Sequence, residues 1–195
     1  MSYLIVGLGN PGEEYADTRH NTGRMVLQKL ETGGWKLDKK LSALVSETKI
    51  GKEKVKLILP ETMMNNSGQS VIALVKSKKA AKKLIVVYDD LDLPLGTLKV
   101  SYNRGDGGHR GLASIIKALK TREFVRVRVG IALTTSSGKI KKPNTEEGII
   151  KFILDKFKDS ELVELKKIFK RAIEALMTIV TGGREKAMNQ FNSSP

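Results

Sequence analysis

The chain has 195 residues, 40% of them hydrophobic, and no cysteine, which suits one globular domain and excludes disulfides and cysteine-based metal sites. No apolar stretch reaches the length of a membrane span and the N-terminus lacks a basic signal segment, so we expect a cytoplasmic protein without membrane association. The formal net charge of +14 favours a polyanionic partner, nucleic acid first, over the alternative of a merely solvated basic surface.

Apolar, β-branched runs alternate along the chain with segments of helical periodicity. In chain order, we expect strands at Tyr3–Leu8, Ala43–Ile50, Lys54–Leu59, Leu84–Tyr88, Thr97–Tyr102 and Val125–Ala132. The helices are expected at Gly23–Leu30, Ser70–Ser77, Leu112–Leu119, Glu146–Leu154 and Ser160–Val180. The sequence KIGKEKVKL indicates a hairpin with Gly51 in the turn. This alternation predicts an α/β fold in which residues 1–195 form a single domain, with helices on both faces of a mixed, twisted sheet.

The first strand is followed by GLGNPG, in which Gly7, Gly9 and Gly12 have the G-x-G-x-x-G spacing of a dinucleotide-binding turn. In such a turn the third glycine lies in the first turn of a helix whose amide groups hold a pyrophosphate. Here a proline precedes Gly12, which removes one amide donor, and two glutamates follow it, which would repel a pyrophosphate. The sequence therefore predicts a tight turn that presents side chains, with Asn10 at the carboxyl end of the strand, where open α/β sheets bind ligands.

His20 follows this polar loop and is one of only two histidines in the chain. A lone histidine is more often structural than catalytic, but one beside a strand end can act as a base if a carboxylate fixes its tautomer. Candidate carboxylates are Asp89, Asp90 and Asp92, which follow the fourth predicted strand. The alternatives for this acidic cluster are a metal site, for which the chain shows no further ligands at metal spacing, and turn or cap chemistry.

Two further polar segments follow the same pattern. Asn65 and Asn66 come after a strand and could grip a peptide or carbonyl without adding charge; the alternative is helix capping, with Ser67 as the N-cap of the next helix. The glycine-rich segment NRGDGGHRGLASI leads into a helix, and its amide groups could hold an anion with help from Arg110.

Five segments together resemble the bacterial-type peptidyl-tRNA hydrolase family. They are VGLGNPGEEYADTRHNTG, PETMMNNSG, DDLDLPLG, GDGGHRGL and VRVRVGI, which occur in family order and with roughly family spacing over nearly the whole chain. The resemblance implies a monomeric α/β hydrolase that needs no metal and no cofactor. It also implies that the partner is peptidyl-tRNA, whose ester bond between the peptide and the terminal ribose is cleaved.

The resemblance implies a role for each matching residue. His20 would be the general base that activates water, Asp89 would hold the imidazole in its basic tautomer, and Asn10 would position the substrate. The other substrate contacts would come from Tyr15, Met63, Met64, Asn65 and Arg110, and the contacts with tRNA phosphates from Lys99 and Arg128.

The residue chemistry agrees with this assignment. Ester hydrolysis by water needs a base that works near neutral pH, which histidine supplies without a metal, and no nucleophile-elbow sequence is present. In VRVRVG, two-residue alternation places Val125, Val127 and Val129 on one face and Arg126 and Arg128 on the other. The alternative for these arginines is the exposed face of an edge strand.

Two positions depart from the family pattern. Arg110 stands where the family usually has asparagine; it can pair with phosphate or carboxylate but cannot accept a hydrogen bond. Ser101 stands where members often have a further lysine, so the tRNA contact is expected to be weaker there or to move onto the lysines of the polar loop Thr134–Glu147.

Two other functions are open on the sequence alone. Some relatives of this family serve as RNA-splicing cofactors, so the chain could bind RNA without hydrolysing it. A nucleotide-cofactor enzyme is disfavoured by the surroundings of Gly12. The joint presence of His20, Asp89, Asn10 and Asn65 favours the hydrolase, because a pure binding protein needs no base with an orienting carboxylate.

Overall fold

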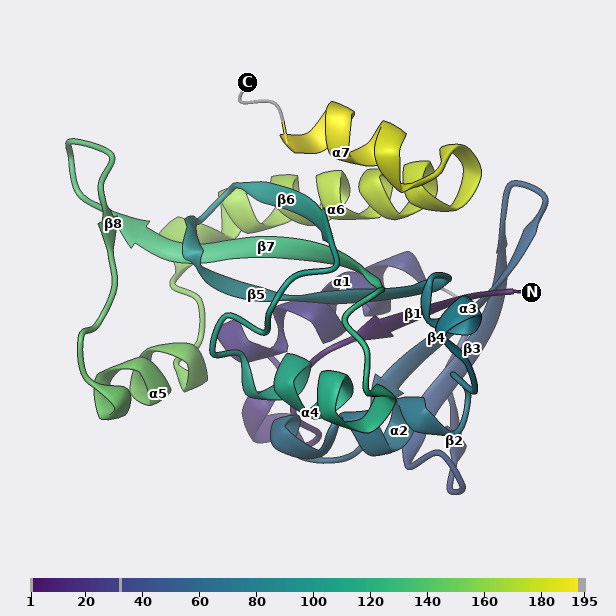
Figure 1. Ribbon diagram of the computed structural model, residues 1–195. Coiled ribbons are helices and arrows are strands. Elements are labelled where there is room, and N and C mark those ends of the chain that lie inside the picture. The colour runs from purple at the N-terminus through teal and green to yellow at the C-terminus, as the bar shows by residue number, and fades with distance from the viewer. Residues whose placement is uncertain (1, 32, 193–195) are drawn as a thin grey trace.

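A mixed eight-stranded sheet forms the centre of the computed structural model, which describes residues 2–31 and 33–192 (Figure 1). The strand order is β2-β3-β4-β1-β5-β7-β6, with β8 paired to β7. Strands β4, β1, β5 and β7 run parallel to one another, whereas β2, β3, β6 and β8 pair antiparallel with their neighbours. The bounds are β1 Tyr3–Gly7, β2 Lys36–Asp38, β3 Ala43–Ile50, β4 Glu53–Pro60, β5 Leu84–Pro94, β6 Leu98–Tyr102, β7 Val125–Thr134 and β8 Ile140–Lys141.

Helices cover both faces of the sheet, as predicted, because its central strands are apolar on both sides. One core joins the sheet to α1, α6 and α7, and a second core on the opposite face joins it to α2, α3 and α4 (Figure 1). The helices are α1 Thr22–Leu30, α2 Gly68–Ile72, α3 Lys78–Ala81, α4 Arg110–Leu119, α5 Glu146–Leu154, α6 Leu162–Gly182 and α7 Arg184–Asn192. Short 3-10 turns occur at η1 Glu13–Tyr15, η2 Arg19–Asn21, η3 Met64–Asn66 and η4 Asp159–Glu161. In the part of the chain that is described, no helix combines the length and apolarity needed to cross a bilayer.

The glycines after β1 serve close packing. A Cβ atom on Gly7 would lie 2.5 Å from the carbonyl oxygen of Gly23, and one on Gly9 would lie 2.9 Å from Cβ of Arg24. Both neighbours belong to α1, so these glycines let that helix approach the strand end. Gly12 precedes the 3-10 turn η1 and not an α-helix. The G-x-G-x-x-G spacing therefore does not build a helix N-terminus for a pyrophosphate.

The parallel strands set the position of the site. Strands β4, β1 and β5 end at the same edge of the sheet, so the segments after them meet there. These segments carry Met64 and Asn65 after β4, and Asn10 and His20 after β1. Asp89 lies two positions past Val87, the residue paired with the last residue of β1. The start of α4 reaches the same edge through the glycine-rich loop that precedes it (Figure 1).

Most predicted elements occur with ends shifted by a few residues, and the hairpin at Gly51 is confirmed. The expected helix over Ser70–Ser77 is wrong in extent: α2 ends at Ile72, and Ser77 instead caps α3 by accepting from the amide of Ala80 at 3.1 Å. Short β2, β8 and α3, and the helix α7, were not expected because each presents too few apolar residues to show a period.

Two alternatives that the sequence left open are not supported by the structure. Strand β7 is not an edge strand, since it lies between β5 and β6, and Arg126 is 0% exposed. Its guanidinium donates to the backbone carbonyl of Arg104 in the loop after β6. The Ser67 hydroxyl does not cap α2; it donates to the carbonyl of Met64 at 2.8 Å, and the Oγ of Ser114 accepts from the amide of Gly68 instead.

Candidate active site

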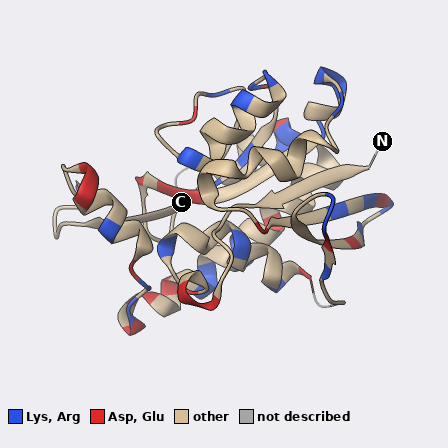
Figure 2. Ribbon diagram, turned by 90° about the horizontal axis from the view of Figure 1, so that it is seen from below, with Lys and Arg blue, Asp and Glu red and all other residues tan. Residues whose placement is uncertain are grey.

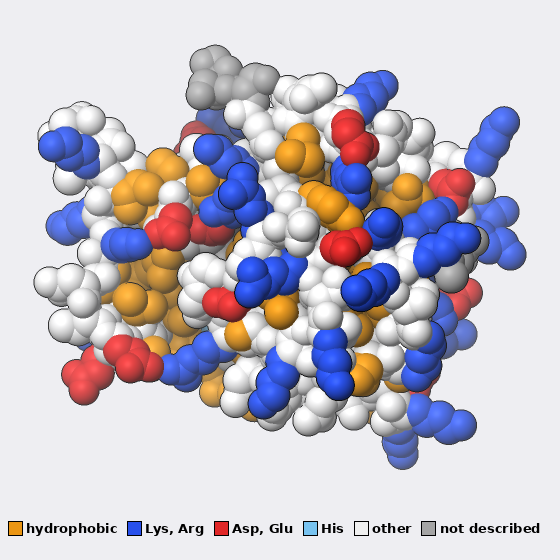
Figure 3. Space-filling model, viewed as in Figure 1, with side chains coloured by type: hydrophobic (Ala, Val, Ile, Leu, Met, Phe, Trp, Pro, Cys, Tyr) orange, Lys and Arg blue, Asp and Glu red, His pale blue; other side chains and the backbone are white. Residues whose placement is uncertain are grey.

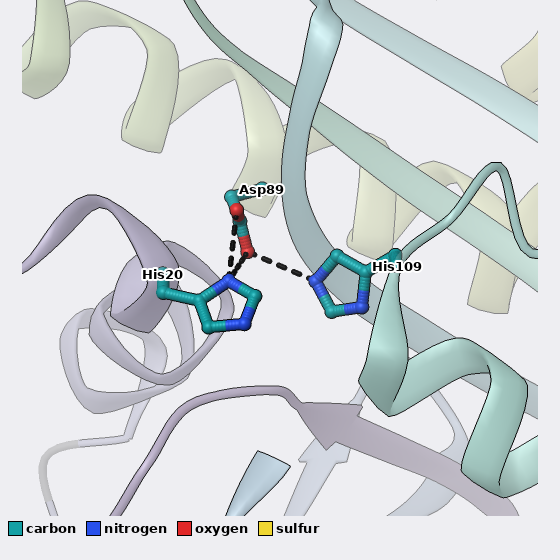
Figure 4. A group of neighbouring side chains, drawn as sticks. All are labelled: His20, Asp89 and His109. Atoms are coloured by element: carbon teal, nitrogen blue, oxygen red, sulfur yellow. Dashed lines mark hydrogen bonds and ion pairs between the residues drawn. The ribbon is translucent and has the colours of Figure 1, made fainter. Parts of the chain in front are cut away.

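One carboxylate is shared by both histidines of the chain. Nδ1 of His20 lies 3.1 Å from each carboxylate oxygen of Asp89, and Nε2 of His109 lies 3.0 Å from Oδ1 (Figure 4). The exposed fractions of His20 and Asp89 are 5% and 3%, and the two imidazole centroids are 4.9 Å apart. The three residues come from η2, β5 and the N-terminus of α4. The fold thus brings His20 and Asp89, which are 69 residues apart in the sequence, into direct contact.

The hydrogen bonds fix both histidine tautomers. Nδ1 of His109 accepts from the amide of Leu112 at 3.4 Å as the N-cap of α4, so Nε2 carries the proton that is donated to Asp89. For His20, Nδ1 faces the carboxylate and therefore carries its proton. Nε2 of His20 points away from Asp89 and keeps a free lone pair (Figure 4).

Asp89 is held as the anion. Burial disfavours its charge, but the two histidines and their hydrogen bonds outweigh this effect and hold the pKa of the carboxyl below its ordinary value. An ionised carboxylate accepts both N–H bonds at once and can stabilise an imidazolium formed on His20.

The turn η2 that carries His20 is anchored by a buried ion pair. The guanidinium of Arg19 donates to the carboxylate of Glu161 at 2.7 Å and to the carbonyl of Lys156 at 2.7 Å. Both side chains are almost fully buried. This contact ties the backbone beside His20 to the segment between α5 and α6, which restricts movement of the imidazole.

Asn10 is fixed by neighbours on both sides. The side chain of Asn21 makes two bonds with its backbone, accepting from the amide at 2.8 Å and donating to the carbonyl at 2.9 Å. Oδ1 of Asn10 accepts from the amide of Met64 at 2.7 Å, which settles its amide orientation. Nδ2 of Asn10 has no hydrogen-bond partner among residues 2–31 and 33–192, so it is available as a neutral donor.

The other expected substrate contacts are spread around this centre. Met64 is buried, whereas Met63, at 46% exposed, and Asn65 reach solvent at η3. Tyr15 is half-buried in η1, and no side-chain contact of the described residues joins it to His20. Arg110 is exposed and donates to Glu146 of α5 at 2.7 Å.

Lys99 and Arg128, the expected phosphate contacts, lie opposite each other on the antiparallel strands β6 and β7. Lys99 is exposed. Nε of Arg128 donates to Asp90 at 2.7 Å. Burial lowers the Arg128 pKa, but this hydrogen bond together with the negative charges of Asp90 and Asp92 and the Tyr88 side chain outweighs burial and raises the pKa. One edge of the guanidinium is therefore already committed, and its other N–H groups remain for a ligand.

A cleft of about 760 Å³ opens beside this centre. Its walls combine the histidine pair and Asp89 with cations, carboxylates and an apolar side formed by Ile149, Ile150 and Ile153 of α5. The space-filling view shows hydrophobic side chains exposed at the left, between α5 and β8, beside charged groups (Figure 3). Lys142 of the Thr134–Glu147 loop crosses one end of the cleft and donates to Asp92 at 2.6 Å. Asn10 and Met64 do not belong to this lining.

Sequence reasoning missed three residues of the site: His109, Asn21 and Arg19. The signal for His109 was present in the sequence, because it is the only other histidine and follows a glycine-rich loop that leads to the same sheet edge. Asn21 and Arg19 flank His20 directly, but nothing in their spacing indicates which backbone groups they bind.

The donor atoms of His20, Asp89 and His109 lie within 4.8 Å of one another, so these side chains could also surround a metal ion. Each of these atoms already takes part in a hydrogen bond within the group. A metal ion would therefore have to displace the bonds that fix both tautomers.

The fold and this cleft define an α/β protein with a histidine–carboxylate centre at the carboxyl ends of its parallel strands. Residues 4–195 match the family model described as peptidyl-tRNA hydrolase. The chain therefore belongs to the peptidyl-tRNA hydrolase family.

Relatives and solved structures agree with this membership. Proteins named peptidyl-tRNA hydrolase from Desulforamulus reducens and Synechococcus elongatus are 42% and 40% identical; each match covers 97% of this chain and 88% or 92% of the relative. The crystal structure of peptidyl-tRNA hydrolase from Acinetobacter baumannii superposes with a TM-score of 0.86 at 34% identity, covering 98% of this chain and 95% of that chain. Both the family and the α/β fold expected from the sequence are confirmed.

Proposed function

We propose that this protein hydrolyses the ester bond between a peptide, or an N-blocked aminoacyl group, and tRNA. The observation that carries the proposal is the contact between His20 and the Asp89 anion, which leaves Nε2 of His20 unprotonated beside an open cleft. Family membership supplies the substrate class.

In the proposed reaction Nε2 of His20 takes a proton from water while the water oxygen attacks the ester carbonyl carbon. The Asp89 carboxylate stabilises the resulting imidazolium. When the tetrahedral intermediate collapses, the bond to the ribose oxygen breaks and the imidazolium returns its proton to that oxygen. The products are a peptide carboxylate and tRNA with a free terminal hydroxyl.

The two halves of the substrate call for different partners. Nδ2 of Asn10 and the exposed amide of Asn65 can bind the peptide group without introducing charge. Lys99 and Arg128 provide the positive charge that suits tRNA phosphates. Tyr15, Met63, Met64 and Arg110 complete the proposed contacts with the substrate, and the protein is proposed to act as a cytoplasmic monomer over one 195-residue domain.

The test is a hydrolysis assay with N-acetyl-aminoacyl-tRNA and free aminoacyl-tRNA. We expect multiple turnovers with the blocked substrate and much slower release from the free one. Chelator in the assay is expected to leave the rate unchanged, because the proposed steps use only side chains and water. Tight tRNA binding without turnover of either substrate would contradict the proposal and favour the RNA-binding alternative.

His109 provides a second test, as a positioning residue that acts through Asp89. His109→Asn keeps an acceptor where Nδ1 caps α4, but its side chain is shorter and does not extend to the position of Nε2, which donates to Asp89. We expect kcat to fall by roughly tenfold with little change in KM or in thermal stability, as for loss of a hydrogen bond to a charged group. His109→Ala, which also removes the cap, should additionally lower the melting temperature. An unchanged kcat in both variants would exclude this role.

A further inference from the structure

Half of the net charge of the chain is concentrated at one place away from the cleft. Residues 76–83 and 117–123 hold eight lysines and arginines and a single acid, Glu123, a net charge of +7 against +14 for the whole chain. We call this the α3–α4 patch; its cations are Lys76, Lys78, Lys79, Lys82, Lys83, Lys117, Lys120 and Arg122.

The two segments form one continuous surface. Lys82 pairs with Glu123 at 3.6 Å, which brings the end of α3 next to the residues after α4. The six cations of the patch other than Lys82 and Lys83 are all exposed. Lys and Arg gather over α3 at the upper right of Figure 2 and on the right half of Figure 3.

The patch lies on the same face of the sheet as the tRNA contacts proposed above. The valines of β7 belong to the core shared with α6, so Arg128 projects toward the face that carries α3 and α4. Helix α4 begins beside His109 at the cleft and ends at the patch; its ten residues span about 15 Å. A rigid polyanion that enters the cleft could therefore reach both ends of this helix.

The other lysine-rich helix, α6, differs from the patch in its acidic neighbours and in the face of the sheet that it covers. Helix α6 has four cations but also Glu164 and Glu174, and Lys167 is paired with Glu164 at 2.7 Å. It covers the opposite face of the sheet (Figure 1). Its positive charge is thus half offset by its own acids, and it lies on the face opposite the α3–α4 patch.

We propose that the α3–α4 patch binds the phosphate backbone of the tRNA body while the 3′ end occupies the cleft. This inference rests on the proposed function for its choice of RNA. The surface fits a phosphate backbone because its cations are close together, exposed and largely free of acidic neighbours. A bilayer fits less well, since α3 has four residues and no large apolar side chain.

The test compares two variants that lower the net charge equally. The patch variant is Lys79→Gln, Lys117→Gln and Lys120→Gln, and the control is Lys166→Gln, Lys167→Gln and Lys170→Gln on α6. For deacylated tRNA we expect the patch variant to raise Kd at least roughly tenfold and to lower the slope of log Kd against log salt by about one unit per lost contact. The control should change neither by more than about twofold.

A short substrate separates body binding from chemistry. N-acetyl-aminoacyl-adenosine cannot reach the patch, so the patch variant should hydrolyse it at the wild-type rate while its KM for N-acetyl-aminoacyl-tRNA rises with kcat unchanged. Equal tRNA affinity in the patch variant and wild type would overturn the inference and leave an acidic protein as the occupant. Equal weakening in the patch and control variants would overturn it too, since bulk charge would then suffice. If the wild type binds tRNA but does not hydrolyse the ester, only the proposed function is contradicted, because the comparison of Kd between the patch variant and wild type does not depend on turnover.

Discussion

His20→Ala is expected to lower kcat for N-acetyl-aminoacyl-tRNA by 10²–10⁴-fold, roughly the contribution of a general base. The reason is that Nε2 is the unprotonated ring nitrogen of His20, since Nδ1 carries the proton that faces Asp89. Alanine leaves no group at this position that can accept the proton of water. KM should change little, because the proposed neutral contacts with the substrate come from Asn10 and Asn65 and not from His20. Single-turnover rates, which report chemistry without product release, are the measurement.

Two controls make this result specific. His20→Asn keeps a polar side chain in the nearly buried site and should be as inactive as alanine, which separates loss of the base from loss of packing. Added imidazole should restore part of the activity of His20→Ala by occupying the space left by the ring. Full turnover in both variants would require a different base.

Asp89→Asn is expected to reduce kcat by a similar roughly 10²–10⁴-fold although the side chain keeps its shape. An amide that donates toward Nδ1 of His20 would place the imidazole proton on Nε2, where it blocks proton transfer. It would also leave no negative charge to stabilise the imidazolium. The measurement is kcat/KM over a range of pH, in which the Asn variant should stay low at every pH where the wild type is active.

The same substitution has a consequence for stability. The pKa of Asp89 is lower in the folded protein than its ordinary value of 3.8, so ionisation of this carboxyl favours the folded state. This contribution is complete above that value and is lost as the pH falls through it toward the lower folded pKa. Urea unfolding from pH 3 to pH 7 should therefore show wild type losing stability below about pH 4 relative to Asp89→Asn. Parallel curves for the two proteins would contradict the linkage.

The strand pattern predicted most of the fold, because long β-branched runs and the helical period of α6 depend on local chemistry. The pattern did not predict α7, whose buried residues are only Ala187 and Phe191. It also did not predict the burial of Arg126, because two-residue alternation tells on which face of the strand a side chain lies but not what covers that face. A guanidinium on the polar side of a strand looks exposed in sequence, yet the loop after β6 folds over it and accepts its hydrogen bond.

Of the candidate site, the resemblance supplied His20, Asp89 and Asn10, and the topology explains why His20 meets Asp89. The segments after β1 and β4 and the polar part of β5 had to share one sheet edge once those strands were parallel. The second histidine could not be assigned in the same way. His109 is placed by the turn of a glycine-rich loop, and its tautomer is set by the free amide of Leu112 at the start of α4.

The convergence of both histidines on one aspartate gives the protein a built-in reporter. Because the chain has only two imidazole rings, every histidine ring signal in a nitrogen-15 spectrum arises from this centre. No signals of other histidines have to be distinguished from them. The two rings differ in which nitrogen bears hydrogen, so their chemical shifts should be distinct and should respond together to substrate or product. Events in the cleft can thus be followed in the native molecule without a label of foreign chemistry.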